Sequence, residues 1–375
     1  MNPSGAVARI RAALPDQQAR RWFRAPGRVN LIGDHTDYSG GFVLPLAIDR
    51  SCALAVHSAE NVRVRSLDAR DVVEVPADGS AEPRSVRPAW GRYVAGVVRE
   101  LATLGRPPAG MDAVVASDVP LGAGLASSAA LEVACAVALS SLAEWDPGIP
   151  ALAEACRVAE ETATGVPCGI MDQLASLAGR IGHALLIDCR SLERRPVALP
   201  EALGILVVHS GVSRSLDASP YAERRRECEQ LARELGVPSL RDATAEQVAT
   251  HPLGRHVVSE NMRVLAAAEA LAQGDLRSLG SLVNASHASL ANDFGVSTPE
   301  LDALVHVLVD AGAYGARLTG AGFGGCIVAV CDMGAAEAIA ELATARYRGR
   351  TRREPTPFLC RAMDGAGPLN APFAS

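Results

Sequence analysis

Eleven residues near the N-terminus combine a dense polar cluster with an apolar frame. The run Arg28-Val-Asn-Leu-Ile-Gly-Asp-His-Thr-Asp-Tyr38 holds an arginine, two aspartates, a histidine and a tyrosine, and the apolar run Phe42-Val-Leu-Pro-Leu-Ala-Ile48 follows it. Charged groups cost free energy to bury unless they are paired. The fold must therefore either expose this segment as a polar turn between two strands or build a pocket around it. Donors and acceptors at this density suit a polyhydroxylated ligand.

The rest of the chain predicts an α+β protein of two domains. Its 375 residues are long for a single core, and half of them are hydrophobic. Strands and helices are mixed without a regular βαβ repeat, which favours α+β lobes over a doubly wound sheet. A polar stretch near 189–203 predicts the boundary between an N-terminal domain (1–190) and a C-terminal domain (191–375).

The periodicity of apolar residues predicts the individual elements. The N-terminal residues 1 to about 20 form an amphipathic helix. The expected strands are 42–48, 52–57, 62–67, 72–75, 111–116, 180–188, 204–209 and 326–331, the last closing the chain after a glycine loop. The further expected helices are 129–145, 151–162, 221–235, 258–272, 276–290 and 298–311.

All 36 basic residues are arginine, and the chain contains no lysine. Walker A loops and protein kinases both need a lysine at the phosphates, and Schiff-base chemistry needs one as nucleophile. The sequence excludes all three classes. The net charge of −6 argues against a nucleic-acid surface.

Nine scattered cysteines, with no C-x-x-C pair, are typical of a reduced cytosolic protein. No apolar stretch reaches transmembrane length and the N-terminus lacks a signal-peptide core, so we expect no membrane partner and a cytoplasmic location. Oligomeric state stays open.

A glycine-rich loop between a strand and a helix is the second notable segment. In Pro120-Leu-Gly-Ala-Gly-Leu-Ala-Ser-Ser-Ala-Ala130, Gly122 and Gly124 let successive N–H groups converge, and the following helix start adds its positive dipole end. Such an anion site needs no lysine. The dinucleotide pattern G-x-G-x-x-G fails because Ser127 occupies its sixth position. A serine helix cap with a flexible lead-in is the alternative.

Two acidic residues complete the candidates for chemistry. Asp172 follows the turn Pro167-Cys-Gly and should lie in the first turn of a helix, and Glu160 ends the preceding helix. Phosphoryl transfer needs positioning and charge neutralisation more than a strong base. Asp172 would suit a substrate hydroxyl, Glu160 a magnesium ion, and Arg28 the transferring group. Taken singly, each is more typical of a surface charge or a cap.

A third cluster, Arg317-Leu-Thr-Gly-Ala-Gly-Phe-Gly-Gly-Cys326, requires close backbone approach. The partner is either a ligand or another segment of the chain, and the sequence favours neither.

Together these segments resemble the GHMP kinase superfamily and, within it, the galactokinases. Ala25–Tyr38 resembles the galactokinase signature, Pro120–Ala130 the ATP loop, Cys168–Gln173 the segment of the catalytic aspartate, and Leu318–Cys326 the third motif. Tyr221–Cys228 also resembles a galactokinase segment. The resemblance implies a two-lobed fold with its active site in the cleft between the lobes. It also implies ATP-dependent phosphorylation of a sugar at its anomeric hydroxyl, in carbohydrate metabolism.

The resemblance assigns roles by motif position. Asp172 takes or orients the hydroxyl proton, and Arg28 stabilises the charge on the phosphoryl group and on Asp172. The remaining roles are magnesium binding by Ser128 and Glu160; phosphate binding by Gly122, Gly124, Leu125, Ser127 and Ser128; adenine contact by Trp90; and sugar contact by Asp34, His35, Asp37, Gly169, Asp172 and Tyr221.

One departure from the family pattern keeps an alternative open. Galactokinases usually carry Glu where this chain has Asp34, at a position facing the exocyclic end of the hexose. The shorter side chain would lengthen or break a direct hydrogen bond. A 1-kinase for a modified or higher-carbon aldose, already phosphorylated at its far end, is therefore the alternative enzyme. A non-catalytic sugar sensor is the alternative from another class, although the ATP loop and Asp172 are intact.

Overall fold

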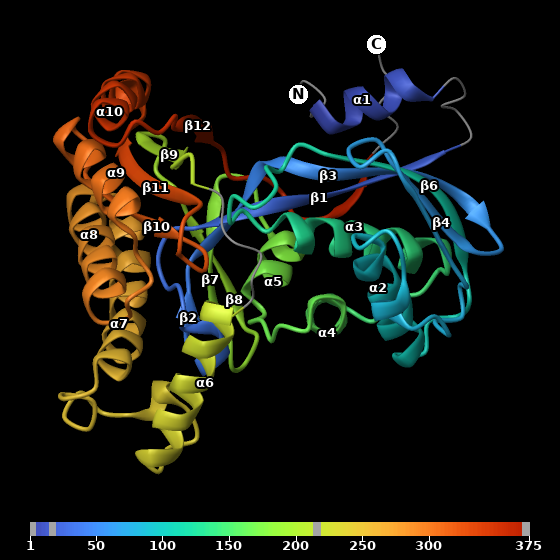
Figure 1. The fold of residues 1–375 in the computed structure, drawn as a ribbon, viewed down its shortest axis with the longest axis horizontal. Coiled ribbons are helices and arrows are strands. Elements are labelled where there is room, and N and C mark those ends of the chain that lie inside the picture. Colours follow the sequence, from blue (N-terminus) through green and yellow to red (C-terminus); the bar gives the residue numbers. More distant parts are fainter. Residues whose placement is uncertain (1–4, 15–19, 213–218, 370–375) are drawn as a thin grey trace.

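Irregularly alternating helices and strands build the protein. A computed structural model describes residues 5–14, 20–212 and 219–369, and these form three separate sheets with helices packed on them (Figure 1). This arrangement confirms the predicted α+β class.

The largest sheet has six strands, and every neighbouring pair is antiparallel except β4 with β6. In spatial order they are β13 (Gly367–Leu369), β1 (Arg21–Asn30), β3 (Pro45–Ala59), β6 (Gly110–Ser117), β4 (Val62–Ser66) and β5 (Val72–Val75).

Helices cover both faces of this sheet. Side chains alternate between the faces of a strand, so Leu54 and Val56 of β3 enter the main core while Ala53 and Ala55 pack under the N-terminal helix. Figure 1 shows that helix, α1, on one face and α3 and α5 on the other. The helices are α1 (Gly5–Ala13), α2 (Gly91–Thr103), α3 (Ser127–Leu142), α4 (Ile149–Thr164) and α5 (Met171–Ala178).

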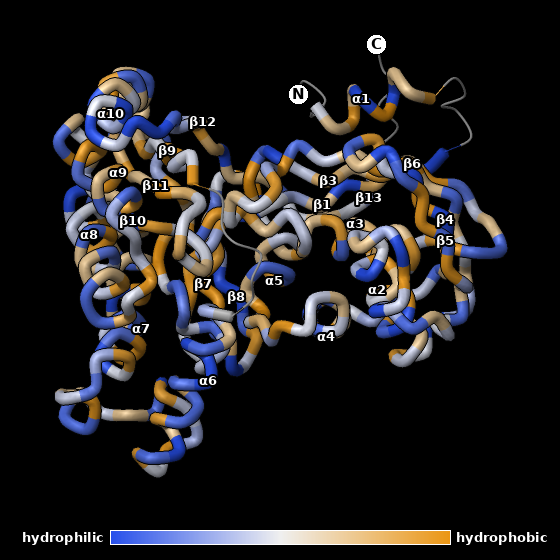
Figure 2. Tube along the Cα trace, viewed as in Figure 1, coloured by the Kyte–Doolittle hydropathy of each residue, from blue (hydrophilic) through white to orange (hydrophobic). Residues whose placement is uncertain are grey.

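A second, fully antiparallel sheet organises the later residues. Its order is β10 (Gly315–Thr319), β11 (Cys326–Asp332), β9 (Leu203–His209) and β12 (Thr356–Cys360). Figure 2 shows hydrophobic residues along these strands and a mixture of both kinds along the helices. The helices that pack against this second sheet are α8 (Leu276–Asn292), α9 (Pro299–Asp310) and α10 (Ala336–Thr351).

A small sheet connects the two regions. It consists of β2 (Phe42–Val43), β7 (His183–Asp188) and β8 (Arg194–Ala198). Helix α7 (Pro252–Gln273) contacts β2 and β8, and α6 (Ser219–Glu234) precedes it. The polar stretch chosen as the domain boundary thus contains strand β8. The division into 1–190 and 191–375 stays a prediction.

Several element predictions were wrong. The break predicted between the strands 42–48 and 52–57 is absent, because β3 runs unbroken from Pro45 through the polar residues Asp49 and Arg50, while Phe42–Val43 forms the separate strand β2. Its partner β1 has a register shift between Pro26 and Arg28, which accommodates the extra residues of β3 between Ala47 and Ser51. The chain also does not close at residue 331, since α10, β12 and β13 follow.

Helix α2 was missed because Gly91, Gly96 and three valines give it low helix propensity. Tertiary packing compensates, with Gly96 lying against the Ala159 backbone of α4. The helix predicted over residues 1 to about 20 corresponds to the shorter α1 (Gly5–Ala13), and positions 1–4 and 15–19 lie outside the described residues.

Of the helices in the described segments, none is long and apolar enough to cross a membrane. All nine cysteines are free and most are buried, as expected for small apolar side chains.

Candidate active site

The polar cluster forms a compact loop between β1 and β2. Gly33 (φ +102°) and His35 (φ +64°) both have positive φ, which reverses the chain. The Thr36 hydroxyl lies 2.8 Å from the carbonyl oxygens of both Gly33 and Phe42, closing the loop. The loop is thus the turn between two strands, and most of its residues are buried.

Asp34 joins this loop to the third glycine cluster. Its carboxylate forms a fully buried ion pair with Arg317 and accepts a hydrogen bond from the Gly320 N–H (3.1 Å). A Cβ on Gly322 would lie 2.3 Å from the Val296 carbonyl oxygen. The close approach that this cluster requires is therefore to other segments of the chain.

Aromatic rings and a second carboxylate line the other side of the loop. The His35 ring lies 5.5 Å from that of Tyr221 in α6 and 4.7 Å from that of Phe294. Desolvation, together with the charge of Asp172, raises the pKa of Asp37 to about 6. Gly169 lies directly against the Asp37 carboxylate. The structure therefore brings four of the predicted sugar contacts, His35, Asp37, Gly169 and Tyr221, close together.

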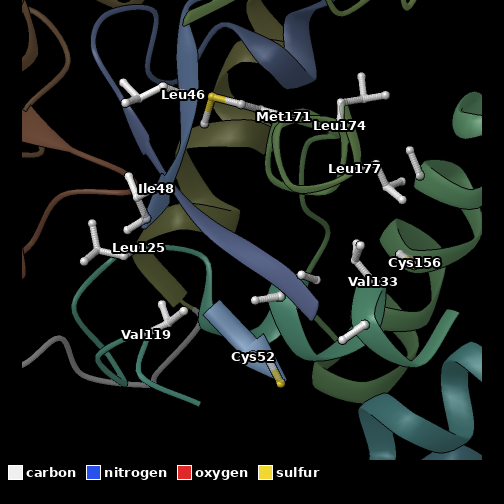
Figure 3. Close-up of a cluster of buried hydrophobic side chains, with 14 of the residues drawn as sticks. Leu46, Ile48, Cys52, Val119, Leu125, Val133, Cys156, Met171, Leu174 and Leu177 are labelled. Carbon is white, nitrogen blue, oxygen red and sulfur yellow. The ribbon is translucent and has the colours of Figure 1, made fainter. Parts of the chain in front are cut away.

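Arg28 and Asp172 form a two-pronged ion pair at the end of β1. Nε and Nη2 of Arg28 donate to the two oxygens of Asp172, both at 2.8 Å. Asp172 lies in the first turn of α5, whose Met171, Leu174 and Leu177 anchor it in the core (Figure 3). Arg28 is only 4% exposed, so it is not a surface charge.

The glycine-rich loop is fixed beside this pair. Leu125 and Val119 are buried in the core (Figure 3), and the Leu125 carbonyl accepts from the Arg28 N–H at 3.1 Å. Gly122 (φ +68°) and Gly124 (φ +79°) have the left-handed backbone that glycine permits. Arg28 Nη1 also donates to the Gly124 carbonyl (2.5 Å), linking the loop to Asp172.

Neither serine of this loop caps the following helix. Ala126 is the N-cap of α3, with φ +60° and no side-chain cap bond, and Ser127 is the first helical residue. The serine-cap interpretation is therefore wrong, and both Ser127 and Ser128 are half-buried.

Ser128 and Glu160 form an oxygen pair next to Asp172. The Ser128 hydroxyl donates to Glu160 Oε1 (2.5 Å), and the Gln173 amide donates to Glu160 Oε2 (2.7 Å). Desolvation raises the pKa of Glu160 to about 7, and the nearby Asp172 charge adds to the shift. A carboxylate with a neighbouring hydroxyl and unbalanced negative charge fits Mg²⁺, which prefers oxygen ligands. Within the described residues no group of three or more His, Cys, Asp or Glu could hold a metal. Nucleotide phosphates would have to supply further ligands.

Two residues near the Ser128–Glu160 pair were not predicted as site residues. Gln173 directly follows Asp172, and Glu132 is a fully buried acid on α3, 3.5 Å from the Gln173 amide nitrogen. Desolvation raises the pKa of Glu132 well above its usual range. The available signal was a charged residue inside the apolar run 129–139.

Trp90 stands apart from these residues. It is the N-cap of α2, is half-buried against the main core, and its Nε1 has no hydrogen-bond partner in the described parts of the chain.

Comparisons with known proteins define the class first. Residues 92–180 match the N-terminal domain of the GHMP kinases and residues 267–349 match their C-terminal region. A mevalonate kinase crystal structure shares the fold, with a TM-score of 0.65 at 20% identity over 92% of this chain and 99% of that one. The protein is thus a GHMP-type kinase in fold.

Closer similarity narrows the class. Residues 13–58 match the galactokinase galactose-binding signature. The galactokinase of Roseiflexus sp. (strain RS-1) is 46% identical over 361 residues, 92% of each chain. That of Homo sapiens is 43% identical over 381 residues, 93% of this chain and 95% of the relative. The crystal structure of Lactococcus lactis galactokinase complexed with galactose has a TM-score of 0.90 at 29% identity, covering 96% and 98% of the two chains. This chain belongs to the galactokinase family, and it is an ATP-dependent sugar 1-kinase.

Proposed function

We propose that this kinase transfers the γ-phosphoryl group of ATP to the C1 hydroxyl of galactose. The observation that carries the proposal is the Arg28–Asp172 ion pair. Burial raises the pKa of both Asp37 and Glu160, and the charge of Asp172 adds to the rise in each, so Asp172 lies close to both carboxyl groups. One ion pair therefore joins the proposed sugar site to the proposed nucleotide site.

Asp172 orients the C1 hydroxyl and receives its proton as the oxygen attacks the γ-phosphorus, while ADP leaves. Because Arg28 holds both carboxylate oxygens, Asp172 acts mainly by position, and a loose transition state needs little basicity. Arg28 also stabilises the charge on the transferring group. The sugar wall consists of Asp34, His35, Asp37, Gly169 and Tyr221.

The nucleotide site uses the loop before α3. The backbone of Gly122, Gly124, Leu125 and Ser127 binds the phosphates, aided by the positive end of the α3 dipole. Ser128 and Glu160 hold Mg²⁺, which when bound neutralises charge on the β- and γ-phosphates. Trp90 lies beside the adenine.

The environment of Asp34 favours one alternative substrate. Its short carboxylate is engaged by Arg317 and Gly320 rather than extended from the loop. A hexose would therefore gain no direct hydrogen bond from an extended carboxylate here, and an aldose longer or modified beyond C5 is the alternative substrate. A sugar sensor without kinase activity has no observation in its favour, since every group that transfer needs is present.

A coupled ADP-release assay over galactose, other hexoses and higher-carbon aldoses, free and phosphorylated at the far end, tests the proposal. We expect turnover of galactose with KM between about 1 μM and 1 mM. Turnover of a longer aldose alone would establish the alternative. Binding of sugar and ATP without ADP release from any sugar would establish the sensor.

A further inference from the structure

Three buried polar side chains of α7 face the backbone of the proposed sugar loop. His256 and Glu260 are fully buried and Asn261 nearly so. His256 and Glu260 lie one turn apart on the same face of the helix, and Asn261 directly follows Glu260. Figure 1 shows α7 beside β2, the strand into which the loop runs.

Each of these side chains binds a main-chain group of the loop. Glu260 Oε1 accepts from the Gly33 N–H at 2.9 Å, and Asn261 Oδ1 accepts from the Phe42 N–H at 2.7 Å. His256 Nε2 lies 3.1 Å from the Asp34 carbonyl oxygen, to which it donates. Buried backbone groups need such partners. The backbone groups of Gly33, Asp34 and Phe42 find these partners in a helix that lies more than 200 residues further along the chain.

Other contacts hold this part of α7 rigidly in place. Glu260 is paired with Arg263 (Nε to Oε2, 2.6 Å) and accepts from the Ser286 hydroxyl (2.5 Å), so its buried charge is compensated. The His256 ring accepts from Ser289 and packs 4.7 Å from the Phe294 ring. Phe294 in turn packs against the His35 ring of the sugar wall.

We propose that Glu260, assisted by His256 and Asn261, is the positioning residue of the sugar-binding loop. By fixing the backbone at Gly33, Asp34 and Phe42, α7 sets where the sugar-facing side chains stand, without touching sugar or nucleotide itself. The inference rests on the proposed function, in that it takes this loop as the sugar site. The inference predicts that changing Glu260 weakens the binding of the sugar and leaves the binding of ATP unchanged.

Glu260→Ala tests this inference in the full-length enzyme. We expect KM for the sugar to rise by about 10-fold or more while KM for ATP stays within about twofold, because misplacing a binding group by 1 Å can cost about 10²-fold. Glu260→Gln keeps an oxygen that can accept from Gly33 and should restore most of the lost affinity. Calorimetric titration with the sugar alone should show the tightest binding for wild type, weaker binding for Glu260→Gln and the weakest for Glu260→Ala.

The matched control is Arg106→Met. Arg106 is also buried and also binds backbone carbonyls, those of Ala77, Pro107 and Ala109, none of which belongs to the proposed site. The Arg106→Met enzyme should have a lower free energy of unfolding than wild type and an unchanged KM for the sugar. If Glu260→Ala does not fold, Asn261→Ala decides by the same criteria.

An unchanged sugar KM, or equal changes in the KM values of sugar and ATP, would overturn the inference. Failure of the proposed function looks different, because the wild-type enzyme would then not phosphorylate galactose. The sugar it does phosphorylate would replace galactose in the same comparison.

Discussion

Replacing Gly169 by alanine should damage sugar binding far more than stability. A Cβ at this position would lie 1.6 Å from Asp37 Oδ2 and 2.1 Å from its Cγ. Ordinary contact begins at 3.4 Å, so the carboxylate must retreat by about 2 Å. The obstacle is the end of a side chain that can rotate, so the loss in free energy of unfolding should lie near the low end of the ~1–3 kcal/mol typical of overpacking.

The functional loss should be larger, because Asp37 is a proposed sugar ligand. A displacement of 1 Å can cost about 10²-fold, so we expect kcat/KM for galactose to fall by about 10²-fold with KM for ATP within about twofold. The coupled ADP-release assay measures both constants, and calorimetry of the unliganded protein measures stability.

Two comparisons isolate the cause. Gly349→Ala in α10 has no atom within 4 Å of its new Cβ and should leave activity unchanged. In an Asp37→Ala background, Gly169→Ala should cost little further activity, because variants acting through one contact are not additive. A galactose kcat/KM within twofold of wild type in Gly169→Ala, or full additivity with Asp37→Ala, would refute the reasoning.

Three further outcomes are expected. Asp172→Asn should lower kcat by at least ~10²-fold with ATP binding by calorimetry near normal, and unchanged turnover would contradict its role. Glu160→Gln should raise the Mg²⁺ concentration needed for half-maximal rate by about 10-fold or more. It should also weaken the binding of Mn²⁺ in the presence of ADP, measured by electron paramagnetic resonance. Wild-type values in both measurements would show that Glu160 is not a metal ligand. Hydrogen bonds from Arg241 lower the pKa of Asp188 to about 2, so this pair stabilises the fold above pH ~4 and the stability is lost as pH falls toward 2. Arg241→Met should therefore cost on the order of 1 kcal/mol at pH 7, because the backbone N–H groups of Arg190 and Ser191 also lower this pKa and solvent screens the pair. The difference from wild type in urea unfolding should shrink below about pH 4, and a gap that is constant with pH would disprove the linkage.

Local signals in the sequence single out residues that the structure brings close together. These signals are an unusual backbone requirement or a charge within apolar sequence. They occur in the polar run 28–38, in the glycines before α3 and at the aspartate after Pro167-Cys-Gly. The structure joins Arg28 to Asp172 and Ser128 to Glu160, as the chemistry required. Judged singly, these residues looked like surface charges or caps, because what distinguishes them is their partner.

The weaker predictions failed where tertiary contacts override local pattern. Strand β3 continues through Asp49 and Arg50 because β1 shifts its register opposite them. Helix α2 forms despite its glycines because Gly96 permits close packing on α4. Neither the register of a neighbouring strand nor the surface of a distant helix is written in the local sequence.

The same limit explains why α7 was predicted as a helix but not as part of the site. Glu260 and Asn261 lie in the predicted helix 258–272, where isolated polar residues normally indicate a solvent-facing side, and His256 lies in the part of α7 before that predicted start. Their partners in the loop are backbone groups, which leave no trace in the composition of either segment. A loop that buries Asp34 and His35 must still satisfy its own main chain, and its neighbouring strands leave the N–H groups of Gly33 and Phe42 to side chains. The requirement can be stated from the sequence of the loop, whereas the helix that meets it is found only once the chain has folded.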